Sequence, residues 1–432
     1  MFKIMGMKPS KCNYILQLEK STLFFNGVTE AFFEVDNRFA ESYKAIIEYP
    51  NDNVDAFPAF IKNIKSKGFV VEEDADELET VKRKYDGLRM RNHYFLMILP
   101  TYQCNLDCWY CTQEHEALFM SENVKDRVIR LIKNKLNDVN IKDLHISWFG
   151  GEPLMAYDRV YEISKFAKKY ADDLGKQFSA SITTNGTLLT PNRIESLRDV
   201  GIVNYQITID GDRTIHNSVK NMGSISAYDR TLVNINQIAK HTHVNLRFNY
   251  CSGNLFPSRI IKSLLGVLNK SVLSNITFSI FKVWQETETR ELSKGANQLF
   301  TSAIEAGMDC TLSSIGLCYA ERFHYDCVFP NGKVGRCDNY PPSVMPGIID
   351  EKGTIQWPES AQFFYASHLF DGHQKQCEEC RFLPICWGPC VAKRETMLKE
   401  YGHIYCNYSS PSADMERLII NTCKSRTQKI LK

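Results

Sequence analysis

The chain has 432 residues, 44% of them hydrophobic and 24% charged, and its net charge of +2 has no skew toward nucleic acid or membrane partners. This length predicts two or three domains, and no stretch comes near the roughly twenty apolar residues of a membrane span. The N-terminus turns polar at once, so no signal peptide is expected. Fifteen cysteines without a secretion signal indicate thiolates kept for metal in a reducing cytoplasm.

Residues 1–88 are the first predicted domain. Apolar periodicity and turn residues predict strands at 14–18, 21–25 and 68–71 and helices at 39–48 and 56–65. These elements suit a small winged-helix-like module, which either binds an extended peptide by strand addition or serves as a structural cap. A charged helical linker is expected to follow, up to residue 91.

Residues 89–308 are the second predicted domain, in which strands alternate with helices. The strands are expected at 93–99, 144–149, 178–183, 203–209, 243–250 and 276–281, and the clearest helix at 122–136. Such βα units predict a parallel sheet, and chemistry in barrels of this kind lies at the carboxyl ends of the strands. The motifs of this region fall at such ends.

Three cysteines follow the first of these strands. Cys104, Cys108 and Cys111 have the spacing C-x3-C-x2-C. Three soft thiolates without a fourth suit a [4Fe–4S] cluster with one open iron. A zinc knuckle that lacks a ligand, or three ordinary buried cysteines, are the alternatives, although structural zinc usually has four ligands.

The second motif is the turn Gly150-Gly151-Glu152-Pro153, which ends the next strand. Two glycines let the backbone come close to a ligand, and Glu152 offers a carboxylate to an ammonium group. Together with Tyr110 in C-x3-C-x-aromatic-C, the two motifs resemble the signature of radical S-adenosylmethionine (SAM) enzymes. The resemblance implies a partial (β/α)6 TIM-like barrel, a SAM-binding cluster on the three cysteines, and a turn that holds the amino group of SAM.

Polar groups at two further strand ends fit the same resemblance. It implies roles near the SAM ribose and carboxylate for Thr184, Asn185, Thr208 and Asp210, although Asn-Gly and Asp-Gly are also ordinary turn sequences. The family often has an arginine after a histidine–aspartate pair, where this chain has His216-Asn217 and then Lys220. Arg247 and Asn249 lie two residues apart on a predicted strand and therefore share one of its faces. Either both side chains point into the barrel, or Arg247 forms a salt bridge in the core.

Residues 309–432 are the third predicted domain and contain ten of the fifteen cysteines. Hairpins are expected around 332–333 and over 347–357, a helix at 360–370, and an amphipathic helix after 415. The last five cysteines are spaced C-x2-C-x5-C-x3-C-x15-C, which resembles the SPASM extension with two auxiliary clusters. The resemblance implies one set of Cys318, Cys327, Cys337 and Cys390, and another of Cys377, Cys380, Cys386 and Cys406. A pair of zinc-ribbon sites is the alternative.

The resemblance implies a peptide maturase that uses a 5′-deoxyadenosyl radical to install a crosslink or another oxidative modification in a ribosomally made precursor peptide. The N-terminal module would bind the leader, and a flavodoxin or ferredoxin would donate electrons. Asp338, next to Cys337, resembles the Cys-Asp step of anaerobic sulfatase-maturing enzymes and would be the catalytic base, the alternative being an ordinary carboxylate at the surface or at a hairpin end. Formylglycine generation in a sulfatase is therefore the alternative function, and a zinc-binding protein without turnover is the remote one.

Overall fold

The computed structural model describes residues 6–113, 115–287, 289–312, 316–338, 347–358, 369–370, 375–406 and 411–430. The chain forms two compact units, one of Met1–Met90, Ser314–Glu321 and Ala366–Lys424, the other of Arg91–Ser313, Arg322–Tyr365 and Ser425–Lys432. The three-domain division stays a prediction. None of the described helices has the length and apolar composition that crossing a bilayer requires.

The first unit begins with a small module in which strands precede and follow three helices. Its elements are β1 (Met7–Pro9), β2 (Asn13–Gln17), β3 (Ser21–Asn26), β4 (Phe32–Asp36), α1 (Ala40–Glu48), α2 (Pro50–Asn53), α3 (Pro58–Ser66), β5 (Val70–Glu72) and the linker helix α4 (Glu77–Arg89). The order β2-β3-β4 makes an antiparallel sheet, and β1 pairs with β5. The predicted strands and helices are confirmed, but β1, β4 and the short helix α2 were missed, and the winged-helix-like character stays a prediction.

The C-terminal cysteine-rich segment packs on this module. Its elements are η3 (Tyr319–Glu321), α13 (Lys375–Glu378), α14 (Leu383–Cys386), α15 (Val391–Tyr401) and α16 (Pro411–Ile430). Tyr14 of β2 stacks on Phe382 with ring centroids 5.3 Å apart, and its hydroxyl donates to the carbonyl of Arg381. Aromatic burial of this kind holds the two segments together. The helix predicted at 360–370 lies almost entirely outside the described residues.

The second unit is built on one large sheet. Its strands run in the order β12-β11-β10-β9-β8-β7-β6-β13-β14-β15-β16, and those from β12 to β13 are parallel. The strands are β6 (His93–Ile98), β7 (Asp143–Trp148), β8 (Gln177–Thr184), β9 (Ile202–Ile209), β10 (His243–Tyr250), β11 (Ile276–Lys282), β12 (Asp309–Thr311), β13 (Tyr325–Val328), β14 (Lys333–Gly335), β15 (Gly347–Ile349) and β16 (Ile355–Gln356).

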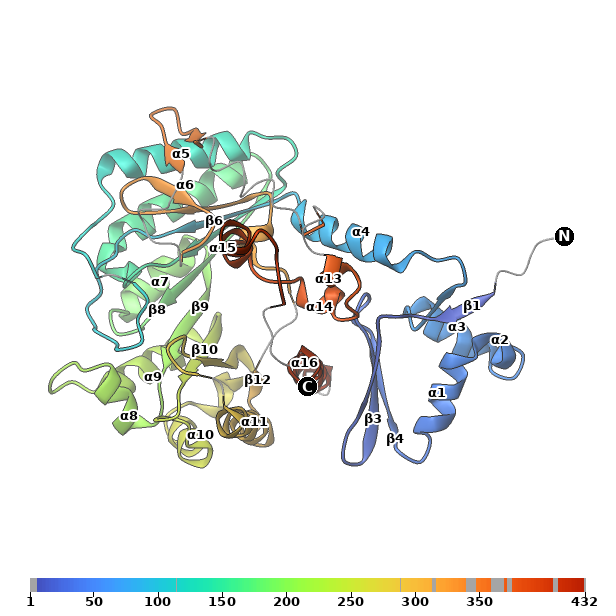
Figure 1. Ribbon diagram of the computed structural model, residues 1–432. Coiled ribbons are helices and arrows are strands. Elements are labelled where there is room, and N and C mark those ends of the chain that lie inside the picture. The colour runs from blue at the N-terminus through green and yellow to red at the C-terminus, as the bar shows by residue number, and fades with distance from the viewer. Residues whose placement is uncertain are drawn as a thin grey trace. The chain divides into compact units, whose positions relative to one another are not determined.

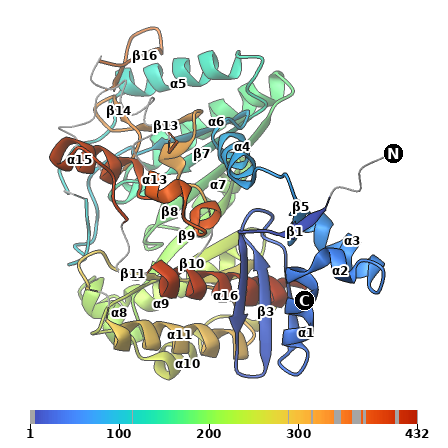
Figure 2. The ribbon, with the colours of Figure 1, turned by 45° about the vertical axis from the view of Figure 1, so that its right-hand side comes forward.

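Helices cover the outer face of this sheet (Figure 1). They are α5 (Glu122–Leu136), η1 (Pro153–Ala156), α6 (Tyr157–Asp173), α7 (Pro191–Asp199), α8 (Arg213–Val219), α9 (Ala227–Ile238), α10 (Pro257–Leu265), η2 (Lys270–Asn275) and α11 (Arg290–Glu305). Figure 2 shows α10 and α11 next to each other below β10 and β11. The six units from β6 to β11 confirm the predicted α/β fold, a partial (β/α)6 barrel.

The two faces of the sheet differ in chemistry. Leu144, Ile146 and Trp148 of β7 are buried under the helices, whereas His145 and Ser147 between them face the inside and are only half-buried. Parallel strands buried on both faces are usually apolar throughout. The alternation here therefore marks the inner face as a polar surface, on which His145 hydrogen-bonds to two serines of β8 at 2.8 and 2.9 Å.

Two hairpins extend the sheet beyond β6. β13 runs parallel to β6, and β14, β15 and β16 then follow as antiparallel neighbours. The hairpins predicted around 332–333 and over 347–357 are confirmed. The sequence did not reveal that β13, which carries Cys327, continues the barrel sheet.

Candidate active site

The Gly-Gly-Glu-Pro turn after β7 lies directly against the segment that leads into Cys104. The amide of Glu152 donates to the carbonyl of Gln103 at 2.9 Å. A Cβ atom on Gly151 would lie 2.3 Å from the carbonyl oxygen of Tyr102 and 2.4 Å from that of Gln103. Only glycine permits this approach. The two motifs that the sequence presents forty residues apart are therefore one structural unit.

The neighbouring residues of the turn are fixed by the same approach. Gly150 has a φ of +121°, and a Cβ there would lie 2.4 Å from the carbonyl oxygen of Thr101. Pro153 is buried and begins η1, where its fixed φ suits the first helical position and no amide donor is needed.

Glu152 is completely buried, and its carboxylate accepts three hydrogen bonds. The donors are the amide of Leu154 at 3.0 Å, the hydroxyl of Thr184 at 2.8 Å and the amide of Asn185 at 2.8 Å. Burial raises the pKa of Glu152, and these donors oppose the rise. Two carboxylate oxygens offer about four acceptor positions, so one remains for a further donor such as an ammonium group. Thr184 and Asn185 thus orient Glu152.

The three cysteines of the loop lie close enough for their charges to interact. The amide of Cys111 donates to the carbonyl of Cys108 at 2.9 Å, and the Asn185 side-chain amide approaches the sulfur of Cys104 at 3.9 Å. Burial raises the pKa of Cys104 to about 11 and of Cys108 to about 12, and the neighbouring thiols add to both shifts. Iron binding to these thiols would therefore release protons.

Across the described residues, no group of three or more histidine, cysteine or acidic side chains could hold a metal ion as placed. This finding does not conflict with a cubane cluster, because each thiolate of a cubane binds a different iron and the sulfurs stand further apart than ligands of one ion. The loop offers three such thiolates, and these residues fit a site-differentiated [4Fe–4S] cluster.

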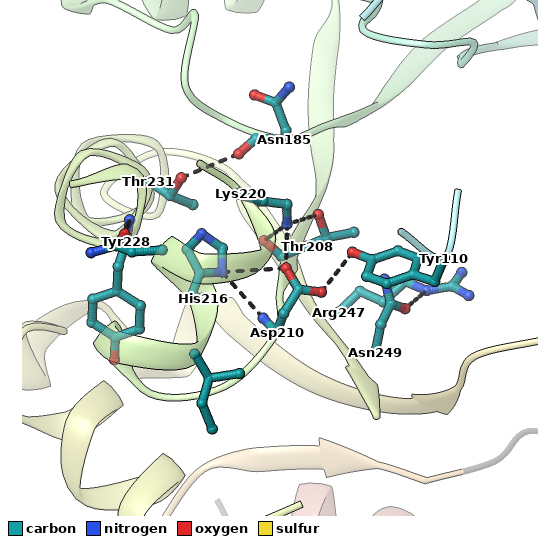
Figure 3. A network of polar contacts seen from close by, with 12 residues as sticks. Tyr110, Asn185, Thr208, Asp210, His216, Lys220, Tyr228, Thr231, Arg247 and Asn249 are labelled. Atoms are coloured by element: carbon teal, nitrogen blue, oxygen red, sulfur yellow. Dashed lines mark hydrogen bonds and ion pairs between the residues drawn. The ribbon is translucent and has the colours of Figure 1, made fainter. Parts of the chain in front are cut away.

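Asp210, at the end of β9, is the centre of a buried polar network (Figure 3). The hydroxyl of Tyr110 donates to Asp210 Oδ1 at 2.6 Å, and Lys220 Nζ lies 2.9 Å from Oδ2. Lys220 also donates to the hydroxyl of Thr208 at 2.5 Å and to its carbonyl at 3.0 Å. The aromatic residue of the cysteine loop is therefore tied to the neighbouring strand end.

The charges of this network are well defined. Burial acts to raise the pKa of Asp210, but the Lys220 ammonium and the hydrogen bond with His216 hold it well below its usual range. Burial, together with Lys220, lowers the pKa of His216 to about 4, so this imidazole is neutral near pH 7. Its Nδ1 lies 3.2 Å from the amide nitrogen of Asp210 and 3.4 Å from Asp210 Oδ2.

Arg247 faces the inside of the barrel, as one of the two sequence interpretations held. Its Nε donates to Asn249 at 2.9 Å, its guanidinium lies 4.4 Å from the ring centroid of Phe281, and no carboxylate of the described residues forms a salt bridge with it. Burial raises the pKa of Asp338, and the positive charge of Arg247 opposes part of that rise. The carbonyl of Asp338 accepts from Gln113 of the cysteine loop at 3.4 Å. Asp338 is therefore next to the loop.

The last cysteine set is gathered around one pocket. Cys377, Cys380, Cys386 and Cys406, here named the C-terminal quartet, line a pocket of about 100 Å³ together with Phe382, Leu383 and Met415. Burial raises the pKa of Cys377 and of Cys386 to about 11, with contributions from other thiols of the quartet. Four thiols around an apolar pocket fit a cluster fully ligated by protein.

The other predicted auxiliary set falls in both units. In the barrel unit the β13–β14 hairpin brings Cys327 and Cys337 together, and Cys327 is completely buried. Cys318 and Cys390 belong to the first unit. This set stays a prediction.

Sequence reasoning missed three functional neighbours. Lys220 and His216 were noted only as departures from the family pattern, although both are buried on Asp210. Their spacing of four residues, around α8, was the available signal. His115 Nε2 lies 3.2 Å from the sulfur of Cys111, and no pattern pointed to it.

Comparisons with known proteins agree with this geometry. Residues 98–247 match the family model of the radical SAM superfamily. The radical SAM cyclopropyl synthase TigE of Paramaledivibacter caminithermalis is 20% identical, over 97% of this chain and 96% of the relative. A serine-type anaerobic sulfatase-maturating enzyme of Bacteroides thetaiotaomicron is 24% identical, over 69% of this chain and 83% of the relative. The solved structure of anSMEcpe with bound AdoMet and Cp18Cys peptide has a TM-score of 0.56 at 16% identity, and the match covers 79% of this chain and 100% of that structure's chain.

The close approach at Gly151 predicts that Gly151→Ala will lose the iron of the cysteine loop. The added Cβ collides with two carbonyl oxygens, so the loop must move away from Glu152. We expect about four fewer irons per chain after anaerobic reconstitution, and loss of SAM binding in equilibrium dialysis. Gly87→Ala is the control, because a Cβ there meets no atom within 4 Å. Full iron and SAM binding in Gly151→Ala would contradict the prediction.

The buried ion pair predicts that Lys220→Met will lower the free energy of unfolding by about 3–5 kcal/mol, because Asp210 is left buried without its cation. Urea denaturation of the iron-free chain measures the change. Asp210→Asn in the same background should recover part of the loss, since the uncompensated charge is then gone. A double variant as unstable as the sum of its single variants would show that the two side chains do not interact.

Proposed function

The chain is an enzyme with a radical SAM domain, and we propose that it is a maturase that oxidatively modifies a ribosomally made peptide. The observation that carries the proposal is the packing of the Gly-Gly-Glu-Pro turn against the cysteine loop. The cofactors of this superfamily are a [4Fe–4S] cluster and SAM, which on one-electron reduction supply a 5′-deoxyadenosyl radical that abstracts hydrogen from an unactivated C–H bond.

The residues of this chain bind and orient the reactants. Cys104, Cys108 and Cys111 would hold the cluster, and Glu152 would accept a hydrogen bond from the SAM ammonium with its remaining acceptor position. Tyr110 and Asp210 would fix the loop against β9, where Thr208 presents its hydroxyl. The burial of Glu152 and Asp210 would keep water out of the site in which the radical forms.

Asp338 is proposed as the base that takes a proton from the substrate when it is oxidised. Its pKa is raised by burial, and it lies beside the cysteine loop and within reach of the charge of Arg247. A carboxylate with a raised pKa in a polar site is suited to general base catalysis. The electron released in the same step would pass to an auxiliary cluster, which we place at the C-terminal quartet, and flavodoxin or ferredoxin would supply the initial electron.

The N-terminal module is proposed to bind the leader of the precursor. In the described residues β4 pairs only with β3, so its outer edge presents backbone groups to which an extended peptide can add as a strand. The solved structure of anSMEcpe was determined with a peptide, which supports a peptide substrate here. The alignment with TigE, which spans 97% of this chain, supports a function that includes the N-terminal module.

Formylglycine generation in a sulfatase is the second candidate. The Cys337-Asp338 step and the 24% identity with a sulfatase-maturating enzyme favour it. That alignment spans 69% of this chain, which is less than the alignment with TigE.

Iron analysis and turnover test the proposed function together. Anaerobically reconstituted protein should contain about twelve irons per chain, and about eight when Cys104, Cys108 and Cys111 are changed to alanine. Short peptides encoded next to the gene are then incubated with the reduced protein and SAM. We expect a mass change in one peptide and 5′-deoxyadenosine, both absent with the triple variant. Aldehyde formation only in a synthetic sulfatase active-site peptide would favour the second candidate, and zinc without iron would exclude both.

The strand-addition proposal predicts where the leader binds. A photoreactive phenylalanine analogue at Glu34 of β4 should crosslink to the modified peptide, whereas the same analogue at Gln17 of β2 should not. Both positions are exposed, but they lie on opposite edges of the three-stranded sheet. Mass spectrometry of the crosslinked product measures the result. Equal crosslinking at both positions would remove the support for β4.

A further inference from the structure

A buried arginine lies behind the C-terminal cysteines with only part of its hydrogen-bonding capacity used. Arg394, one turn into α15, is 1% exposed, and its Nη2 donates to Glu321. Its Nε and Nη1 have no hydrogen-bond partner among the described residues. Leaving such donors unpaired in a protein interior is costly, and more so for a charged group. We therefore expect an acceptor near Arg394 that pairs with its Nε and Nη1 donors.

Glu321 is the acceptor for one nitrogen of Arg394, Nη2. Glu321 is 4% exposed, and its second oxygen accepts the hydroxyl of Tyr85 at 2.6 Å. The backbone of the same pair is tied to cysteines, because the amide of Glu321 donates to the carbonyl of Cys318 at 3.1 Å and the amide of Arg394 to that of Cys390 at 2.9 Å. This ion pair therefore belongs to the cysteine-bearing framework of the first unit.

Packing connects the Arg394–Glu321 pair to the C-terminal quartet. Tyr85, which donates to Glu321, belongs to the apolar cluster against which Cys377 of the quartet packs, and the positive charge of Arg394 acts on the Cys377 thiol. Cys377 packs with Tyr85, Leu383 and Trp387 in one apolar cluster, and Leu383 also lines the quartet pocket. A low-polarity surrounding screens little, so a buried cation here acts strongly on any charge held by the quartet.

We infer that Arg394 is the electrostatic partner of the iron–sulfur cluster proposed at the C-terminal quartet and raises its reduction potential. A cluster ligated by four thiolates is anionic, and reduction by one electron adds a further negative charge. A buried guanidinium stabilises the reduced form more than the oxidised form, and hydrogen bonds to cluster sulfur act in the same direction. Such a cluster is the better acceptor for the electron released when a substrate is oxidised. The inference rests on the auxiliary cluster of the proposed function.

The experiment uses the full chain in which Cys104, Cys108 and Cys111 are alanine, so that only auxiliary clusters contribute to the spectrum. Redox titration followed by electron paramagnetic resonance gives the midpoint potential of each cluster. Arg394→Met should shift one auxiliary potential to more negative values, and Arg394→Lys should shift it less. Glu321→Gln should shift the same potential in the opposite direction, because it removes a negative charge from the same site. Lys393→Met, an exposed loss of the same charge on α15, is the control and should leave both potentials unchanged.

The opposite signs distinguish an electrostatic role from a structural one. If Arg394 only holds the segment together, both Arg394→Met and Glu321→Gln will lose iron, and no potential will shift with the sign of the charge removed. That result, or equal potentials in Arg394→Met and Lys393→Met, would overturn the inference. Should Arg394→Met fail to retain iron, the sign of the Glu321→Gln shift decides, and a negative or absent shift overturns it. Absence of any auxiliary signal in the parent protein would overturn the auxiliary cluster itself, and the inference with it.

Discussion

The approach of two glycines to the backbone before Cys104 is the constraint on which the site depends. A hydrogen bond from Glu152 to Gln103 joins the turn to the loop, and the missing Cβ atoms make that distance possible. Because the turn ends β7 and the loop follows β6, the parallel pairing of these two strands sets the register of both motifs. The barrel thus converts a separation of forty residues in sequence into direct contact.

The ends of the next strands, β8 and β9, also contribute groups to the site. Each strand end adds one group to the site: Thr184 and Asn185 from β8 orient Glu152, and Asp210 after β9 fixes Tyr110. Carboxylates at the edge of a partly polar barrel attract water, but Glu152 and Asp210 are both buried and paired with donors of the protein. Preorganised donors of this kind replace solvent without having to move during the reaction.

Periodicity and short motifs predicted most of the barrel, because its strands and helices have strong local signals. Helix α5 and strand β10 begin and end where the sequence placed them. Strand β13 was missed because its pairing is set by a partner far away in sequence, with Cys327 opposite Met97 of β6. Lys220 was missed for a related reason, because a lysine directly after a short polar helix is expected to be solvated until the fold buries it on Asp210.

Two buried cations, Lys220 and Arg394, show why burial has to be considered together with partners. Lys220 has a carboxylate, a hydroxyl and a carbonyl within hydrogen-bond distance, so its three donors are used and its charge is neutralised by Asp210. Arg394 has one carboxylate for five donors, and two of its nitrogens are left over. A cation of the first kind holds a site in place, whereas a cation of the second kind retains donors for a group that the polypeptide itself does not supply.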